Sequence, residues 1–473
     1  MTAPNIPELS AGAGRVLLRL PPNTNVSLTP RVVEIIDHPA FQRLRQVYQL
    51  GPTHMVYPGA VHTRFEHSLG VYTTASQYLR HLLGVPEFAL GVSEADLLTV
   101  LAAALLHDLG HYPMAHSLEA LHHKGNDTPR HEDIAASIIR GDHPRWRGNR
   151  PIGEILRTRW KIDPERVIAF ITRPARSHAK DHDALLASII SSGIDADKMD
   201  YLARDSLHMG VPYGDRVDRQ RLLDSLTVSS DGRSIAVTSK GRLPAEIFIF
   251  SRYTMFSEAY WHHTVRSVSA MIEAAMADLQ THGVLDQDRQ TLADDMLARS
   301  DAEMLDWLHS MAPPNTVADR ILTGVTRRRR QLYKRVLTLS GLFHEPRTDA
   351  AYARLKQLDS QTLRQLVQSL RQALEQQLGV SIDPGGLIID IPPRDKDHLE
   401  DVEVAFPALA GHRTRRLTEI SGVVGALSAD FLRVVKKARV FVAPEYADAL
   451  RGHQDRLEEM ALECIEALDP PSG

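Results

Sequence analysis

Residues 97–116 read LLTVLAAALLHDLGHYPMAH, the most apolar run of the chain. Ser93 and Asp96, at its start, have the Ser-x-x-Asp spacing of a capping box, so a helix is predicted from about residue 94 to about residue 109. The predicted helix is apolar nearly all round. Such a helix is buried, so this stretch indicates the centre of a large helical core.

Two titratable side chains, His107 and Asp108, stand at the inner end of this helix. Burying them costs several kcal/mol unless something compensates their polarity. One interpretation is a core histidine that is hydrogen-bonded to its neighbouring carboxylate. The other is a bound metal ion.

Two further segments offer ligands of the same kind. Residues 62–70 read HTRFEHSLG and contain His67, while residues 194–206 read IDADKMDYLARDS and contain Asp197. Three separated segments thus offer His67, His107, Asp108 and Asp197 as possible ligands. Two imidazoles and two carboxylates suit iron, manganese, nickel or magnesium, whereas a structural zinc site favours thiolates.

The order H…HD…D, with the motifs HTRFEHSLGV, LLHDLGH and DADKMDYLARD, resembles the HD-domain phosphohydrolases, and among them the deoxynucleoside triphosphate triphosphohydrolase branch. The likeness extends, with gaps, from about residue 28 to about residue 393. It implies a mainly α fold, with an HD-domain helical core, a small β-hairpin insertion and a small α+β C-terminal region. It also implies that the four residues bind a divalent metal ion, and that a deoxynucleotide is hydrolysed to deoxynucleoside and inorganic triphosphate.

The resemblance assigns catalytic roles beside the metal to His116, Glu119, His131 and Arg64, with His111 in the same stretch. If His116 and Glu119 share a helix, their i, i+3 spacing places the carboxylate beside the imidazole, where it orients a general acid. The alternative is that these are surface histidines of a helix-rich loop.

The resemblance also assigns residues to the substrate. Arg64 lies at the α-phosphate, and Lys198 and Arg252 hold the outer phosphates, with salt bridges to local acids as their structural alternative. The positions that line the sugar are Gln49, Leu50, Tyr201, Asp205 and Tyr260. Tyrosine rings that leave no room for a 2′ hydroxyl would reject ribonucleotides.

Mammalian members of this branch are activated by nucleotides that bind between subunits and build a tetramer, which implies a homo-oligomer, either a dimer or a tetramer. The positions that match that site are Asp37, Gln42 and Arg45, together with Arg330, Leu332 and Lys334. The usual Asp-Pro-(Ile/Val)-His-Gly turn is absent, because residues 20–25 read LPPNTN. The alternative is that residues 42–45 only pack against and pair with an N-terminal helix.

Composition bounds the remaining classes. The 473 residues are 43% hydrophobic and carry a net charge of −4, so neither nucleic-acid nor membrane binding is indicated by total charge. A single cysteine, Cys464, and a start without a signal peptide favour the cytoplasm. No phosphate-binding glycine loop is present, so side chains and metal must hold phosphates.

Two other functions are weighed against the triphosphohydrolase. A phosphohydrolase of another nucleotide would carry HD-x-x-ED, as in alarmone hydrolases, or a GYP motif, as in cyclic dinucleotide phosphodiesterases, and both are absent. A single-stranded nucleic-acid-binding protein or nuclease would use the basic strip at residues 326–335, TRRRRQLYKR. The alternative interpretation is that the strip is a solvent-exposed face of a helix.

Four units are predicted along the chain: an N-terminal segment (1–27), an HD-domain catalytic core (28–285), a helical extension with the basic strip (286–375) and a small α+β subdomain (376–473). Residues 1–14 are expected to be a loose terminus, and Thr29 is expected to cap a helix that starts at Pro30. Strands are predicted at 15–20, 387–391 and 439–443, a hairpin around 233–239 and a final helix over 445–468.

Overall fold

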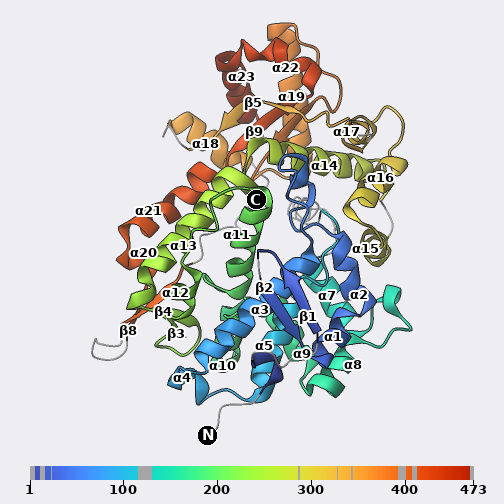
Figure 1. Cartoon of the computed structure of the whole chain (residues 1–473). Coiled ribbons are helices and arrows are strands. Elements are labelled where there is room, and N and C mark those ends of the chain that lie inside the picture. The colour runs from blue at the N-terminus through green and yellow to red at the C-terminus, as the bar shows by residue number, and fades with distance from the viewer. Residues whose placement is uncertain are drawn as a thin grey trace.

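The computed structural model of the chain describes residues 6–10, 16–22, 24–114, 130–285, 288–326, 329–341, 345–392, 401–406 and 413–468. These residues form a mainly helical fold with small sheets, which confirms the predicted fold class (Figure 1). Within these ranges no helix has the length and apolar character needed to cross a membrane.

Helix α5 (Glu94–Leu106) lies at the centre of the core. Its start has the predicted capping box, because the Ser93 hydroxyl accepts the Asp96 N–H and the Asp96 carboxylate accepts the Ser93 N–H at 2.8 Å. All of its residues from Asp96 onward are buried, as the apolar run predicts. The helix ends three residues before the predicted end, with His107 as its C-cap, and a turn then carries Asp108.

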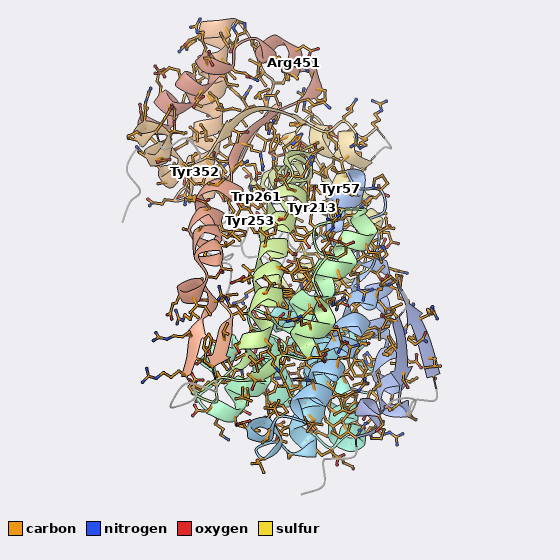
Figure 2. The ribbon with its side chains drawn as sticks, turned by 60° about the vertical axis from the view of Figure 1, so that its left-hand side comes forward. Tyr57, Tyr213, Tyr253, Trp261, Tyr352 and Arg451 are labelled. Atoms are coloured by element: carbon orange, nitrogen blue, oxygen red, sulfur yellow. The ribbon has the colours of Figure 1, made fainter. Side chains whose placement is uncertain are left out.

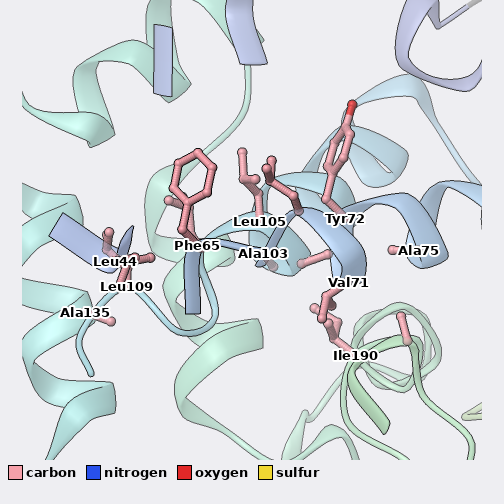
Figure 3. Packing of buried hydrophobic residues seen from close by; sticks show 14 of the residues in the cluster. Leu44, Phe65, Val71, Tyr72, Ala75, Ala103, Leu105, Leu109, Ala135 and Ile190 are labelled. Atoms are coloured by element: carbon pink, nitrogen blue, oxygen red, sulfur yellow. The ribbon is translucent and has the colours of Figure 1, made fainter. Parts of the chain in front are cut away.

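Helices α3 (Arg64–Leu82) and α9 (Pro164–Thr172) pack against α5. Figure 3 shows side chains of α3 and α5 meeting in this core, with Val71 and Leu105 among them. Gly110 lets helix α7 (His131–Arg140) approach the turn after α5, because a Cβ there would lie 1.9 Å from the carbonyl oxygen of His131. The close packing holds the residues after His107 in one position.

Replacing Asp96 by asparagine is expected to lower the free energy of unfolding at pH 7 by roughly 2 kcal/mol. Burial by itself raises the pKa of Asp96, but hydrogen bonds from Ser93 and pairing with Arg166 lower it to about 2. A carboxyl whose pKa is lowered by folding stabilises the protein above its unfolded pKa, near 3.8, and loses this effect as the pH falls through about 2. Urea denaturation at several pH values checks this, since the difference between wild type and Asp96→Asn should shrink below pH 4. A difference that is constant with pH would contradict it.

The N-terminal residues pack on the core more closely than expected of a loose terminus. Residues Pro7–Leu9 form a short 3-10 helix, and the buried Glu8 accepts hydrogen bonds from the Thr29 hydroxyl at 2.5 Å and from the Arg31 Nε at 2.7 Å. Thr29 stands at the N-cap position of α1 (Pro30–Ile36) as predicted, but its hydroxyl donates to Glu8 and makes no capping bond. The predicted strand is β1 (Val16–Leu20), which pairs antiparallel with β2 (Thr24–Leu28).

Further core helices surround α3 and α5: α2 (Pro39–Gln42), α4 (Pro86–Ala89), α8 (Ile152–Ile155), α10 (Asp181–Ala187), α11 (Ala196–Met209), α12 (Arg219–Leu223), α13 (Arg242–Thr254) and α14 (His263–Thr281). A π-helical turn, Met255–Tyr260, joins α13 to α14. The helical extension follows as α15 (Arg289–Leu297), α16 (Asp301–Met311) and α17 (Val317–Thr326).

The predicted hairpin forms from β3 (Leu226–Val228) and β4 (Ile235–Thr238). It belongs to a four-stranded sheet, because β7 (Glu403–Phe406) pairs parallel with β4, and β8 (Arg413–Arg416) pairs with β7. The helices α20 (Leu417–Ile420) and α21 (Gly422–Asp430) come next, and α21 packs on α13. Strand β7 is thus joined to the core about 170 residues before it in the chain.

The C-terminal sheet has the order β5-β9-β6, from Lys334–Leu339, Ala438–Val442 and Leu387–Asp390. Its neighbouring helices are α18 (Pro346–Leu355), α19 (Ser360–Leu378), α22 (Pro444–Arg451) and α23 (Gln454–Glu466). The two predicted strands are confirmed to within a residue, whereas the predicted final helix is two helices, α22 and α23. Trp261, labelled in Figure 2, ties this sheet to the core. Its indole N–H donates to the backbone carbonyl of Lys437, and its own carbonyl accepts from Arg439 at 2.7 Å.

In the basic strip, residues 329–335 are described beyond the end of α17, and they form no helix. The strip runs into strand β5, and Leu332 and Tyr333 within it are buried. The Tyr333 hydroxyl donates to the carbonyl of Gly385 at 2.7 Å. These two side chains anchor the strip to the core, which overturns the helical prediction for this part of residues 286–374.

Candidate functional site

Three of the four predicted metal ligands converge from three helices. His67 is on α3, His107 caps the end of α5, and Asp197 is in the first turn of α11. The Nε2 atom of His67 lies 3.2 Å from the Nε2 atom of His107 and 3.0 Å from an Asp197 carboxylate oxygen. These three side chains form a group able to hold one metal ion.

Asp108 lies beside this group but is shared with other partners. Its two carboxylate oxygens lie 3.5 Å from the Nε2 atom of His107 and 3.9 Å from that of His67. One oxygen also accepts a hydrogen bond from Arg64 at 2.8 Å, and the other lies 3.1 Å from the Nε2 atom of His111. Asp108 therefore joins the candidate metal centre to two further polar side chains.

The two histidines are oriented as metal ligands. The Nδ1 atom of His67 lies 2.9 Å from an Asp200 carboxylate oxygen, and that of His107 lies 2.9 Å from the carbonyl oxygen of Ala104. With a metal ion bound, a proton on each Nδ1 would satisfy these acceptors, and the Nε2 atoms beside Asp197 would bind the ion. Two imidazole nitrogens and adjacent carboxylates fit a divalent cation of the transition series.

The electrostatics of the group favour a cation. Burial lowers the pKa of His67, but the carboxylates of Asp197, Asp200 and Asp108 outweigh it and raise this pKa to about 10. Burial raises the pKa of Asp108, but Arg64 and the nearby histidines hold it well below its usual range. Concentrated negative charge at a buried position is what a bound metal ion compensates.

The sequence reasoning missed Asp200. Its carboxylate accepts two hydrogen bonds from Arg204, at 2.8 and 2.7 Å, and Arg204 also donates to Glu66 at 2.6 Å. Asp200 follows Asp197 by three residues and precedes Arg204 by four, so all three lie on one face of α11. That spacing is the signal that could have identified Asp200 as the residue that orients His67.

The residues predicted for the sugar gather at the other end of α11. The Tyr260 hydroxyl donates to Asp205 at 2.5 Å, and the rings of Tyr201 and Tyr260 meet edge to face at 6.4 Å. His62, which was not predicted, lies 2.8 Å from the second Asp205 oxygen and stacks on His208. These contacts pair both oxygens of Asp205 within the protein.

Gln49 lies beside the start of helix α3, and Leu50 follows it in the chain. The Gln49 carbonyl accepts from Arg64 at 3.5 Å, and its N–H donates to the His62 carbonyl. The Gln49 side chain is buried, and its Oε1 atom has no hydrogen-bond partner among the described residues. A buried amide oxygen in that state is available to a hydroxyl of a bound molecule.

Lys198 and Arg252 are the two cationic residues predicted to hold the outer phosphates. Lys198 is paired with Asp195, the N-cap residue of α11, at 2.8 Å, which is the salt bridge that its structural alternative anticipates. Arg252 is buried in the last turn of α13. Burial raises the pKa of Tyr201 to about 12, and the charges of Arg252 and Lys198 oppose that rise.

The predicted acid and its neighbours are described only in part. His131, the first residue of α7, stacks on His111 with ring centres 3.7 Å apart. Burial and the charge of Arg64 hold the pKa of His111 well below its usual value. His116 and Glu119 lie outside the described residues.

The predicted regulatory residues form two groups. Asp37 is exposed at the end of α1, and the Gln42 side chain accepts a hydrogen bond from Arg45 at 2.8 Å. Arg330 donates to the carbonyl of Met55 at 2.7 Å, and Lys334 is exposed at the start of β5. Leu332 packs in the core, whereas Arg330 and Lys334 are exposed, as are Arg329 and Arg335 beside them.

Comparison with known proteins gives two family matches. Residues 64–205 match the HD domain and residues 217–461 match the HD associated region. The uncharacterized protein YwfO of Bacillus subtilis is 38% identical over 241 residues, which is 50% of this chain and 50% of that protein. The deoxynucleoside triphosphate triphosphohydrolase SAMHD1 of Homo sapiens is 32% identical over 283 residues, 54% of this chain and 43% of that protein. The chain thus matches about half the length of each of these relatives.

A solved structure agrees over nearly the whole chain. A hypothetical protein from Aquifex aeolicus superposes with a TM-score of 0.65 at 25% identity, over 92% of this chain and 99% of that chain. The arrangement of the helical core and of the C-terminal sheet is therefore that of an experimentally observed fold.

Proposed function

The chain belongs to the HD domain family, and from that premise we propose that it is a metal-dependent deoxynucleoside triphosphate triphosphohydrolase. In the proposed reaction, the oxygen of a water molecule attacks the α-phosphorus and the bond from that phosphorus to the 5′ oxygen breaks. The products are a deoxynucleoside, which receives a proton on its 5′ oxygen, and inorganic triphosphate. The name of the human relative supports this substrate class.

The observation that carries the proposal is that one helix bears both ends of the site. Asp197 stands in the first turn of α11 beside His67, and Asp205 stands eight residues later beside Tyr260. Eight helical residues rise about 12 Å. That span accommodates a phosphate at the metal end and a deoxyribose at the other end of one nucleotide.

Positive charge at the reacting phosphate has two proposed sources, the bound metal ion and Arg64. A divalent ion, when bound by His67, His107, Asp108 and Asp197, supplies Lewis-acid polarisation of the phosphate. The Arg64 guanidinium, which Asp108 holds at 2.8 Å, adds positive charge beside the same oxygens. In the proposal, His116 protonates the leaving 5′ oxygen with Glu119 as its partner, and His131 lines the phosphate.

Two groups of residues are proposed to select the substrate, one at each end of the site. Lys198 and Arg252 hold the outer phosphates, and Asp205 and Gln49 are placed to hydrogen-bond the 3′ hydroxyl beside Leu50. For Asp205 to accept a substrate hydroxyl, it must share or release its contact with Tyr260. The rings of Tyr201 and Tyr260 exclude a 2′ hydroxyl.

Regulation is proposed at the surface groups already described. An activating nucleotide would contact Asp37, Gln42 and Arg45 of one subunit together with Arg330 and Lys334, in a dimer or a tetramer. The Gln42 amide bonds to Arg45 and to the Ile36 carbonyl, and the exposed Arg45 guanidinium is the group proposed to meet such a ligand.

The test is product analysis. Purified chain is incubated with each deoxynucleotide and ribonucleotide, singly and in mixtures, with Mn²⁺, Mg²⁺ or Fe²⁺, and the nucleoside and nucleotide products are separated. We expect deoxynucleoside and triphosphate, with ribonucleotides slower by about 100-fold or more. A requirement for a second nucleotide would support the regulatory site. A metal-loaded protein that turns over no mixture would overturn the proposal.

A further inference from the structure

We propose that Asp301, in the helical extension outside the HD domain, is a positioning residue that holds the substrate-binding segment 47–50 in place. This inference rests on the proposed function, because Gln49 and Leu50 belong to the proposed sugar site. Asp301 is the first residue of α16, 2% exposed, and separated by 253 residues from the segment it contacts.

The contact is a single hydrogen bond to a backbone group. The Asp301 carboxylate accepts the N–H of Tyr48 at 2.7 Å. The neighbouring backbone groups are bonded within the core, since Val47 accepts from the Arg64 N–H and Gln49 donates to the His62 carbonyl, both at 2.9 Å. Asp301 thus supplies the partner that the core does not provide for the middle of this segment.

The surroundings of Asp301 place it where three parts of the proposed site meet. Burial raises the pKa of Asp301 to about 6. Arg64 and the backbone of Met114 each lower this pKa, but burial outweighs them. Met114 lies against Gly51, the residue after Leu50, because a Cβ on Gly51 would be 3.5 Å from the Met114 Cα. A shift of Asp301 would therefore be felt at Gln49, at Arg64 and at the start of the segment that carries His116.

The second Asp301 oxygen takes no part in the contact with Tyr48. Its Oδ1 atom is buried and has no hydrogen-bond partner among the described residues. Burial raises the pKa of Asp301, and the hydrogen bond from Tyr48, followed by the charge of Arg64, opposes that rise. Asp301 therefore orients the segment through Tyr48 and interacts electrostatically with Arg64, which the proposal places at the α-phosphate.

The experiment compares three variants of the full chain. Asp301→Ala removes the acceptor for Tyr48, Asp301→Asn keeps an oxygen acceptor without the charge, and Glu303→Ala weakens the same helix start, since Glu303 caps Ser300 at the surface. For each, KM and kcat are measured for the hydrolysed deoxynucleotide, and hydrogen exchange is measured for a peptide that contains residues 47–50.

We expect Asp301→Ala to raise KM about tenfold with a smaller change in kcat, and to speed exchange at 47–50. Asp301→Asn should restore slow exchange and bring KM to within about twofold of wild type. Glu303→Ala should leave both unchanged. Unchanged exchange in Asp301→Ala, or the same change in Glu303→Ala, would overturn the proposal. If the wild-type chain turns over no deoxynucleotide, the proposed function fails, and the exchange measurement alone decides whether Asp301 holds the segment.

Discussion

His107→Ala is expected to lose the bound metal and to reduce hydrolysis by about 1,000-fold or more. The Nε2 atom of His107 lies 3.2 Å from that of His67. Among the described residues, His107 belongs to the group of three side chains that could hold a metal ion. Removing it leaves His67, Asp197 and Asp108 to hold the ion, and Asp108 also pairs with Arg64. Metal content per chain and the rate of deoxynucleoside release measure the two effects.

A matched control separates ligand loss from general damage. His282 is an exposed histidine at the end of α14 that contacts only its own helix through the Asp278 carbonyl. His282→Ala should keep the metal and the rate. A His107→Ala variant that binds one metal ion per chain and keeps the wild-type rate would contradict the assignment of His107.

Gly70→Ala is expected to cost about 3 kcal/mol or more of unfolding free energy and to weaken metal binding. A Cβ at residue 70 would lie 2.1 Å from a carboxylate oxygen of Asp200 and 2.3 Å from a guanidinium nitrogen of Arg204. Both groups are buried and bonded to each other, so neither can withdraw without breaking the pair. Because Asp200 also orients His67, the disturbance reaches the candidate metal centre.

Urea denaturation and metal titration of Gly70→Ala check this result. Gly452→Ala is the control, since nothing lies within 4 Å of a Cβ at that position and its backbone is not left-handed. The control should be close to wild type in both measurements. Wild-type stability in Gly70→Ala would show that the Asp200–Arg204 pair does not constrain α3.

The convergence of His67, His107 and Asp197 was predictable because each lies in a distinctive local motif. The long apolar helix indicates burial of His107, and HTRFEHSLG and DADKMDYLARD give the other two. The motifs also predicted Asp108 as an equal ligand. They could not indicate that Arg64 takes one of its oxygens, because that contact depends on how α3 enters the core.

Non-local pairs set the limit of the sequence reasoning at the site. His62 contacts Asp205 across 143 residues, and Asp301 contacts Tyr48 across 253. Neither pair shares a helix face or a motif, so no local periodicity connects its members. Asp200 is different, because its spacing from Asp197 and Arg204 was visible and its role depended only on the position of His67.

Strands were harder to predict than helices for the same reason. The basic strip contains six charged residues among its ten, which favours an exposed helix. Leu332 and Tyr333 nevertheless bury their side chains, and β5 pairs with β9 about 100 residues later. Likewise β4 gains a parallel partner, β7, from beyond residue 400. A strand stabilised by a distant partner carries little local signal of its own.

The most direct test of the central claim is hydrolysis of a deoxynucleoside triphosphate in water enriched in ¹⁸O, followed by mass spectrometry of the products. Attack at the α-phosphorus with cleavage of its bond to the 5′ oxygen predicts one ¹⁸O atom in intact triphosphate and none in the deoxynucleoside. Release of orthophosphate or pyrophosphate with a deoxynucleotide, or label in the deoxynucleoside, would contradict the proposed reaction.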